Sequence, residues 1–176
     1  MPLEFENVSR DVPMDNKGGT GNHFLIALAS DITALPLPAD TDLTAAGSIP
    51  AASITLAATK SWKRIEATLD RGQINSEPIG GRDSGSYRNT ATVHSAANNA
   101  KKVGLANYMN NKDVIVLVPE RNTGQYRVFG TLTDPAFVKP ASGTGDGAEG
   151  QNEARFVIES VGLMAPYVTG TVTVGP

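Results

Sequence analysis

The chain contains no cysteine. This absence excludes disulfide bonds, iron–sulfur clusters, thiolate zinc sites and cysteine nucleophiles, so stability must come from packing or assembly. An excess of basic residues is also missing, since 15 Lys and Arg against 18 Asp and Glu give a net charge of −3. Non-specific binding of nucleic acids depends on such an excess. We therefore expect no tight binding of DNA or RNA.

Long apolar runs are missing as well. No stretch reaches the roughly 18 apolar residues of a membrane-spanning helix, and the start of the chain is acidic and contains proline, unlike a signal peptide. We expect neither export by such a signal nor membrane insertion. A chain of 176 residues suits one domain, and its 18 Gly and 11 Pro favour many short strands over long helices.

Motifs for catalysis or cofactor binding are not found. The two histidines, His23 and His94, are far apart in the sequence and lack the spacing of a metal site. The Gly-rich segments 18–21 and 80–81 lack the residues that complete a phosphate-binding loop. The serines beside Asp83 lack the GxSxG turn of a hydrolase. We expect no enzymatic activity, no metal and no cofactor.

Two runs of alternating residues indicate strands with one face in water. They cover 54–69 and 87–94, and we expect them to pair antiparallel. Between them, at 71–89, lies a polar, Gly-rich arm loop. A flexible connection of this length loses conformational entropy when it becomes ordered, and it has little apolar surface whose burial could offset that loss. The arm is therefore expected to become ordered by a partner.

Further elements follow from local patterns. A helix is expected at about 95–111, with Ser95 as its N-cap. The apolar run 114–118 predicts a strand that is buried on both faces, and the turn at 122–124 makes 113–130 a hairpin. Strands are also expected at 23–30, 155–161 and 167–174, and a second flexible loop at 139–152.

The order of these elements predicts an α+β, mainly β fold. We expect a β-sandwich or barrel-like subunit with one flanking α-helix and long extended arms and loops. The chain then divides into an N-terminal arm at 1–22, a single β-rich domain at 23–166, and a C-terminal strand or arm at 167–176.

The succession of elements resembles a known family. A strand ending near Asp70 is followed by SEPIGGRDSGSYRN, ANYMNNKDVIVLV and NTGQYRVFG, and then by ARFVIES and LMAPYVTG. Over about residues 60–170 this order resembles the major tail proteins, or tail tube proteins, of tailed bacteriophages. The resemblance implies a structural virion protein, made in the host cytoplasm, that self-assembles into stacked rings, expected to be hexameric. Genome DNA would pass through the tube during ejection without tight binding, and other tail proteins would be further partners.

The resemblance also implies roles for particular residues. Contacts between rings or subunits would come from the arm, through Glu77, Pro78, Ile79, Arg82, Asp83, Tyr87, Arg88 and Asn89. The flanking strands would line the channel with Arg64, Glu66, Thr68, Asp70, Thr90 and Thr92. The segments 1–22 and 167–176 would add contacts between rings. The sequence departs from this picture in having no acidic run on those strands, where negative charge would repel DNA.

Two other classes of function stay open. One is another β-rich phage component, namely a tail terminator, a head–tail connector or a capsid decoration protein. The other is a non-enzymatic glycan-binding module, in which aromatic rings exposed side by side would stack on sugars. The candidate rings are Trp62, Tyr87, Tyr108, Tyr126 and Tyr167. The competing interpretation is that these rings fill a core or an interface.

Overall fold

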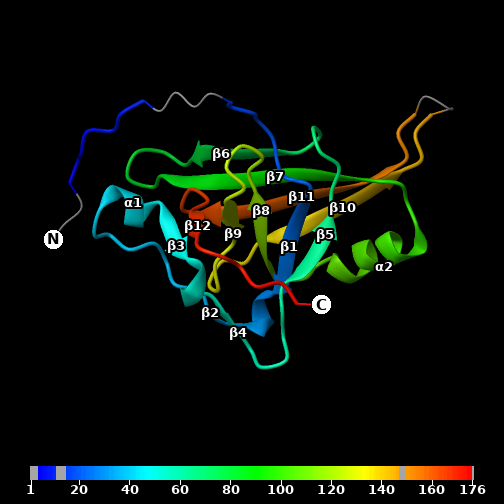
Figure 1. Ribbon diagram of the computed structural model, residues 1–176, viewed down its shortest axis with the longest axis horizontal. Coiled ribbons are helices and arrows are strands. Elements are labelled where there is room, and N and C mark those ends of the chain that lie inside the picture. Colours follow the sequence, from blue (N-terminus) through cyan, green and yellow to red (C-terminus); the bar gives the residue numbers. More distant parts are fainter. Residues whose placement is uncertain (1–3, 11–14, 147–149, 176) are drawn as a thin grey trace.

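Two β-sheets packed face to face form the body of the protein in the computed structural model, which describes residues 4–10, 15–146 and 150–175 (Figure 1). A six-stranded sheet has the strand order β3-β12-β9-β8-β1-β5, and a four-stranded sheet has the order β10-β11-β7-β6. A third, small sheet pairs β2 with β4. The prediction of a mainly β, α+β fold is confirmed, and its sheets form an open sandwich.

The strands have the following bounds. The six-stranded sheet contains β1 (His23–Leu28), β3 (Ser48–Pro50), β5 (Lys63–Glu66), β8 (Val114–Pro119), β9 (Tyr126–Phe129) and β12 (Tyr167–Thr169). The four-stranded sheet contains β6 (Gln73–Ile79), β7 (Ser86–Ala96), β10 (Phe137–Gly143) and β11 (Glu153–Gly162). The small sheet pairs β2 (Ile32–Ala34) with β4 (Thr55–Leu56). The strand β12 runs parallel to β3 and antiparallel to β9.

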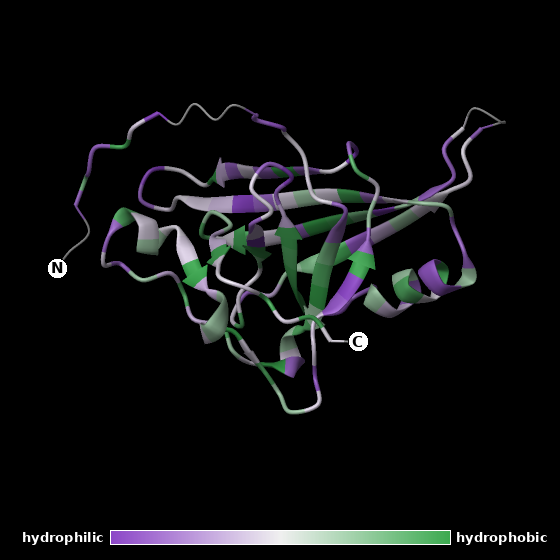
Figure 2. Ribbon diagram, in the orientation of Figure 1, coloured by the Kyte–Doolittle hydropathy of each residue, from purple (hydrophilic) through white to green (hydrophobic). Residues whose placement is uncertain are grey.

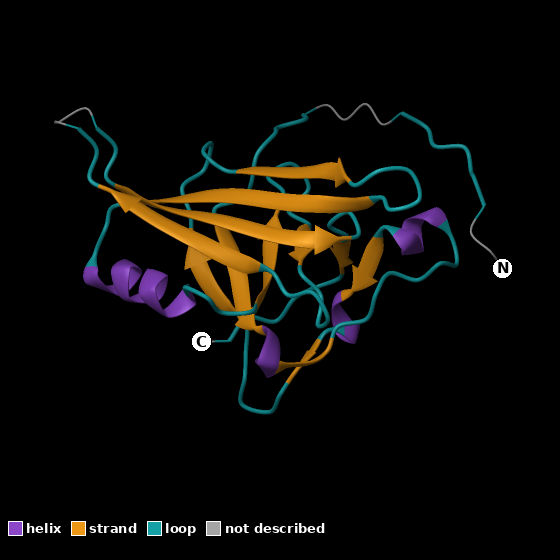
Figure 3. Cartoon of the chain, turned by 180° about the vertical axis from the view of Figure 1, so that it is seen from behind, coloured by secondary structure: helices purple, strands orange, loops and turns teal. Residues whose placement is uncertain are grey.

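Helical segments are short. The helices are α1 (Leu43–Ala46) and α2 (Ala100–Met109), and the 3-10 turns are η1 (Ala29–Asp31) and η2 (Ala51–Ser53). Helix α1 was not expected, and it is capped by Asp42, whose Oδ1 accepts from the Ala45 amide at 2.8 Å. Helix α2 lies beside the sandwich rather than across the outer face of the four-stranded sheet (Figure 3).

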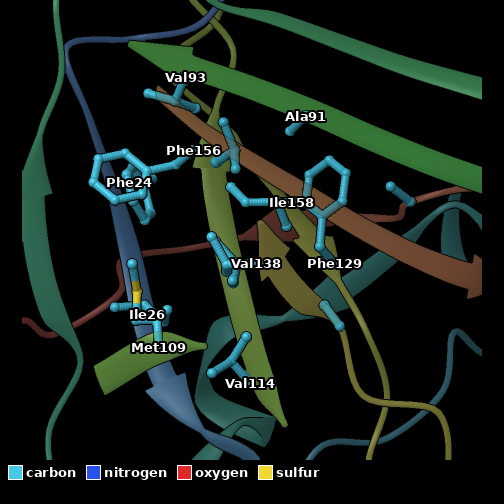
Figure 4. Packing of buried hydrophobic residues seen from close by; sticks show 14 of the residues in the cluster. Phe24, Ile26, Ala91, Val93, Met109, Val114, Phe129, Val138, Phe156 and Ile158 are labelled. Atoms are coloured by element: carbon cyan, nitrogen blue, oxygen red, sulfur yellow. The ribbon is translucent and has the colours of Figure 1, made fainter. Parts of the chain in front are cut away.

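The main core lies between the two sheets (Figure 4). Phe24 of β1 and Phe156 of β11 face each other across it, with ring centroids 5.6 Å apart. Strands β7 and β11 supply it with every second side chain, including Ala91, Val93 and Ile158, and the residues between them point outward. This period of two is the reason why the expected strands at 87–94 and 155–161 are found.

A second core covers the opposite face of the six-stranded sheet. Leu25, Ile115 and Leu117 of the sheet pack there against Trp62 and residues of segment 32–56. Every residue of β8 is therefore buried, as predicted from its uninterrupted apolar run. The predicted hairpin at 113–130 is also confirmed, because β8 and β9 pair antiparallel from Val116–Phe129 to Pro119–Tyr126.

The expected pairing between 54–69 and 87–94 is wrong. Strand β5 is at the edge of the six-stranded sheet and pairs with β1, whereas β7 lies in the other sheet between β6 and β11. After β5 the chain crosses to the end of β7, where the Thr68 amide donates to the His94 carbonyl at 2.7 Å. The apolar strand β1 accepts a partner on each edge, and β7 is already paired on both edges.

Two segments predicted as loops contain strand residues. Residues 73–79 of the expected arm form β6, which makes a hairpin with β7 from Gln73–Thr92 to Ile79–Ser86. The expected loop at 139–152 begins within β10, which pairs with β11 up to Gly143–Glu153. Residues 147–149 of that loop lie outside the described residues. Both segments are stabilised by hydrogen bonds to a neighbouring strand, which their polar sequences do not reveal.

The predicted helix exists, but it begins later than expected. Ser95 is buried in β7 and pairs with Ala154, so it caps no helix. The N-cap is Asn99, whose side-chain Oδ1 accepts from the Lys102 amide at 2.8 Å. The alternation of β7 continues through Ala96, and Ala97 then turns the chain with a φ of 60°. The helix can therefore start only beyond this turn.

The two ends of the chain differ. Residues 4–10 are fully exposed and run away from the sandwich (Figure 1), but Thr20 is buried and forms a bridge with Glu120. The predicted arm at 1–22 is therefore joined to the body at its last residues. At the other end, β12 is an inner strand of the six-stranded sheet, and Val174 forms a bridge with Trp62.

Candidate interaction surfaces

The four-stranded sheet presents a broad outer face. Because the inward residues of β7 and β11 fill the core, their neighbours in the sequence point the other way. Among them Arg88 and Arg155 are exposed, and Thr90 and Thr92 are half-buried. Gln73, Asn75 and Glu77 of β6 lie in register with this outer set, as do Phe137, Lys139 and Ala141 of β10. We call this surface the outer face.

The outer face carries charges of both signs, and two of its basic residues have a carboxylate opposite them on the neighbouring strand. Lys139 Nζ lies 2.8 Å from Glu159 Oε2 on the neighbouring strand. Glu77 stands opposite Arg88 in the register of β6 and β7. Figure 2 shows polar and apolar residues alternating along these strands. With the cluster at its end included, this surface holds one more basic than acidic side chain, which is a small excess of positive charge to offer to phosphates.

One end of the outer face holds a compact ionic cluster. Glu153 Oε1 lies 2.9 Å from His94 Nδ1, and Arg71 forms an ion pair with Oε2 of the same carboxylate. The cluster joins the first residue of β11 to β7 and to the segment before β6. Both carboxylate oxygens of Glu153 therefore have a partner, and the cluster holds the ends of β7 and β11 and the segment before β6 together.

The residues expected to make contacts between rings lie on the β6–β7 hairpin. Arg82 and Asp83 are exposed in the turn at 80–85, which begins with Gly80 at a φ of +87°. A Cβ at Gly80 would lie 2.2 Å from the Ser84 carbonyl oxygen, so only glycine fits there. Of the remaining candidates, Glu77, Pro78 and Arg88 are exposed, and Ile79 and Tyr87 are half-buried.

Asn89 does not belong with these contact residues. Its side chain is only 2% exposed. The Nδ2 group donates to the Leu163 carbonyl at 2.7 Å, while Oδ1 accepts from the Ala165 amide at 3.0 Å and from Ser76 Oγ at 2.6 Å. Asn89 therefore connects β7 to β6 and to the segment after β11, and its prediction as a contact residue is wrong.

The six residues expected to line a channel do not share one surface. Thr90 and Thr92 lie on the outer face. Arg64, Glu66 and Thr68 line a groove beside α2, at the edge of the other sheet. Asp70 forms an ion pair with Arg121. The split follows from the pairing of β5 with β1, which places its side chains away from those of β7.

The groove beside α2 was not predicted. Its wider part, of about 550 Å³, lies between α2 and the edge strand β5, and its narrower part, of about 240 Å³, continues toward the end of β1. Leu105 contributes to both parts. We call the two together the α2 groove. Only the packing of α2 against a strand from a distant part of the sequence creates it, so no local pattern could indicate it.

The five large aromatic rings do not form a shared platform. Trp62 is 3% exposed in the second core, and Tyr126 packs edge-on against His23, whose Nε2 lies 2.7 Å from the tyrosine hydroxyl. Burial, reinforced by nearby Arg64, lowers the pKa of His23, and burial raises the pKa of Tyr126. Tyr108 alone among the five is largely exposed. This arrangement does not favour stacking on a glycan.

The described residues offer neither a cluster of metal ligands nor a helix that could span a membrane. Within residues 4–10, 15–146 and 150–175, no group of three or more His, Asp or Glu side chains could hold a metal ion. No helix of the described part of the chain is long and apolar enough to cross a membrane. Comparisons with protein-family models, with curated proteins and with solved structures found no match for this chain.

Proposed function

We propose that this chain is a structural subunit of a phage tail, and that its copies assemble into stacked rings that form a tube for genome passage. The observation that carries the proposal is the four-stranded sheet, which combines a broad outer face with two edge strands, β6 and β10. The sandwich with one flanking helix agrees with the resemblance to tail tube proteins. Hexameric rings, location in the virion and contacts with other tail proteins are parts of this proposal.

The edge strands provide a route to ring closure. Strands β6 and β10 each pair with one neighbouring strand in the described chain, so each has a second edge. Helix α2 lies near β10, and the Gly143 carbonyl already accepts from Asn98 Nδ2 at 2.9 Å, so a partner strand would pair with the part of β10 before Gly143. A β10 edge of one copy beside the β6 edge of the next would continue the sheet around a ring. Pro78 in β6 and Pro140 in β10 each remove one donor, which restricts pairing to registers that avoid them.

The outer face suits the wall of a channel for DNA. A closed ring of these sheets would turn one face inward, and the mixed charges of the outer face would give phosphates little net attraction. Thr90 and Thr92 would then line the channel as expected, together with the cross-strand pair of Lys139 and Glu159. Arg64, Glu66 and Thr68 would lie elsewhere, beside α2.

Contacts between rings would come from the two ends of the four-stranded sheet. The β6–β7 hairpin turns at 80–85, next to the pair Ile79–Ser86, and the β10–β11 hairpin opens beyond the pair Gly143–Glu153. Since β7 pairs with β11 from Tyr87–Gly162 to Ala96–Glu153, these two turns lie at opposite ends of the sheet. One end would face the ring above and the other the ring below.

Negative-stain electron microscopy of the purified full-length protein tests the proposal. We expect rings or tubes with a central channel. Single rings that never stack would instead favour a tail terminator or connector, and a monodisperse monomer at high concentration under all salt conditions would refute self-assembly.

The turn at 80–85 is tested by shortening it. Replacing these six residues with Asn-Gly keeps the β6–β7 pairs, because a two-residue turn closes an antiparallel hairpin. We expect a subunit with wild-type thermal stability that forms rings but no longer stacks. The double variant Arg82→Lys/Asp83→Glu keeps length and charge and serves as the matched control. Normal tubes from the shortened protein would exclude this turn as a ring contact.

A further inference from the structure

Residues 4–10 carry apolar side chains that are exposed to solvent. Phe5 is 106% exposed and Val8 is 83% exposed, so neither side chain is buried by the rest of the chain. Glu4 and Glu6 flank the phenylalanine. A large aromatic ring between two acidic residues, on an extended segment, is typical of a motif that becomes buried in a partner.

The α2 groove has the complementary properties. The floor of its narrower part is apolar, with Leu28, Leu105 and Met109 among the lining residues. Its rim is basic, since Lys112 borders the narrower part and Lys101 borders the wider part. Lys60 also lines it but is paired with Asp31, with Nζ and Oδ1 3.1 Å apart. The groove thus joins an apolar floor to positive charge at both ends of α2.

We propose that residues 4–10 of one copy dock in the α2 groove of a neighbouring copy. Phe5 enters the narrower, apolar part, and the carboxylates of Glu4 and Glu6 lie beside the lysines of the rim. The inference rests on the proposed self-assembly and names one contact that this assembly would use.

The edge strand β5 strengthens the choice of an extended occupant. It forms one side of the groove and pairs only with β1 among the described strands. An extended segment lying along it would find backbone donors and acceptors as well as the apolar floor. Residues 4–10 have no regular secondary structure of their own, so no existing element has to be broken first.

A neighbouring copy is favoured over the chain's own arm. The arm joins the body just before His23, at the start of β1, whereas Leu28 at the other end of β1 lines the narrower part of the groove. Five steps along β1 place these two ends about 17 Å apart, which the residues between 10 and 23 are long enough to span. Residues 4–10, however, lie on the side of the sandwich opposite α2 (Figure 1). A ring, by contrast, brings the arms and grooves of different copies together repeatedly, which multiplies a modest contact.

The absence of cysteine allows a direct test by disulfide crosslinking. Asn7→Cys, which keeps Phe5, and Tyr108→Cys are purified separately, mixed and oxidised, and Tyr108 borders the narrower part of the groove. We expect a disulfide-linked heterodimer, identified on non-reducing gels by a mass tag on one partner. Leu163→Cys replaces Tyr108→Cys in the control, because both native side chains are 58% exposed and oxidant access is therefore matched.

Several results would overturn the docking. These are equal crosslinking to Leu163→Cys, no crosslinking to Tyr108→Cys, or closure within single chains of an Asn7→Cys/Tyr108→Cys double variant without heterodimer formation. Electron microscopy of the wild-type protein separates this failure from failure of the proposed function. Rings or tubes without the crosslink would reject only the arm contact, and absence of rings would reject the tube.

Charge reversal tests the role of the rim. Glu4→Lys/Glu6→Lys in the Asn7→Cys protein should lower the crosslinking yield by about tenfold, since attraction becomes repulsion at two positions. Lys101→Glu/Lys112→Glu in the Tyr108→Cys protein should then restore it. An unchanged yield with the reversed arm would show that charge plays no part and would overturn the proposed orientation.

Discussion

Arg127 Nε donates a hydrogen bond to Oε1 of Glu120 at 2.8 Å, which connects β9 to the end of β8. The Tyr167 hydroxyl donates to the same carboxylate oxygen at 2.9 Å, and Arg127 Nη1 donates to the Ala165 carbonyl at 3.2 Å. Burial, together with the hydrogen bond to Glu120, raises the pKa of Tyr167. The guanidinium therefore fixes β12 in the six-stranded sheet, next to the segment in which Asn89 is anchored.

Replacing Arg127 by Met is expected to destabilise the subunit. The variant leaves Glu120 and the Ala165 carbonyl without their charged donor. A hydrogen bond to a charged group contributes about 1.5–3 kcal/mol to the free energy of unfolding. We expect a loss of about 2 kcal/mol in the free energy of unfolding, measured by urea denaturation. Arg155→Met, on the exposed outer face, should change it by less than about 0.5 kcal/mol. Equal effects of the two substitutions would contradict the importance of the network.

Features that depend on neighbouring residues could be predicted from the sequence. The hairpin of β8 and β9 joins an apolar run to a turn that ends in Gly124, whose φ is +69°, all within about twenty residues. Strands β7 and β11 were recognisable because their inward side chains fill one core and therefore alternate strictly. In each case the local sequence shows either the neighbouring strand, through a short turn, or the buried face, through alternation of apolar side chains.

Features that depend on distant pairing could not be predicted. The alternation around Ile65 shows that one face is buried, but not that β1, about forty residues earlier, is its partner. The segment QINSEPI contains a proline and mostly polar residues, and it forms β6 because β7 offers its edge. The α2 groove requires α2 to lie beside β5, which is decided by packing alone.

Asn89 gives a test that separates stability from assembly. Asn89→Ala leaves the Ala165 amide and the Leu163 carbonyl without their side-chain partner in a buried place. We expect a loss of about 2–4 kcal/mol in the unfolding free energy of the isolated subunit, because buried unsatisfied groups retain their desolvation cost. Asn75→Ala, on the exposed part of β6, is the control and should change little. A stable Asn89→Ala subunit with an assembly defect would instead restore Asn89 to the contact surface.

His23 is expected to make stability depend on pH. Its pKa is lowered from the ordinary value of 6.5, chiefly by burial and then by Arg64. The unfolded chain therefore takes up a proton at a higher pH than the folded one. The free energy of unfolding therefore keeps its full contribution from neutral His23 above about pH 6.5, and this contribution is lost as the pH falls through the pKa of His23 in the folded protein.

The matching experiment compares urea midpoints of the wild type and of His23→Gln between pH 4 and pH 8. We expect the wild type to lose more stability than the variant on acidification below about pH 6.5, because glutamine takes up no proton. His94→Gln is the control variant, because it removes the other histidine of the chain, which is paired with Glu153, and leaves His23 in place. Parallel pH profiles for the wild type and His23→Gln would disprove this role.

The cap of α2 connects stability to the proposed docking groove. Asn99 Oδ1 accepts from the Lys102 amide at 2.8 Å, and Asn99 also lines the wider part of the α2 groove. Asn99→Ala should cost about 1 kcal/mol and should speed hydrogen exchange of amides in the first turn of the helix. Asn99→Ser keeps an oxygen acceptor and should behave almost as the wild type. Because a frayed first turn moves Lys101 away from the rim, Asn99→Ala should also reduce the crosslink between Asn7→Cys and Tyr108→Cys chains, while Asn99→Ser preserves it. Exchange rates in this turn that are the same in both variants would show that Asn99 is not the group that starts the helix.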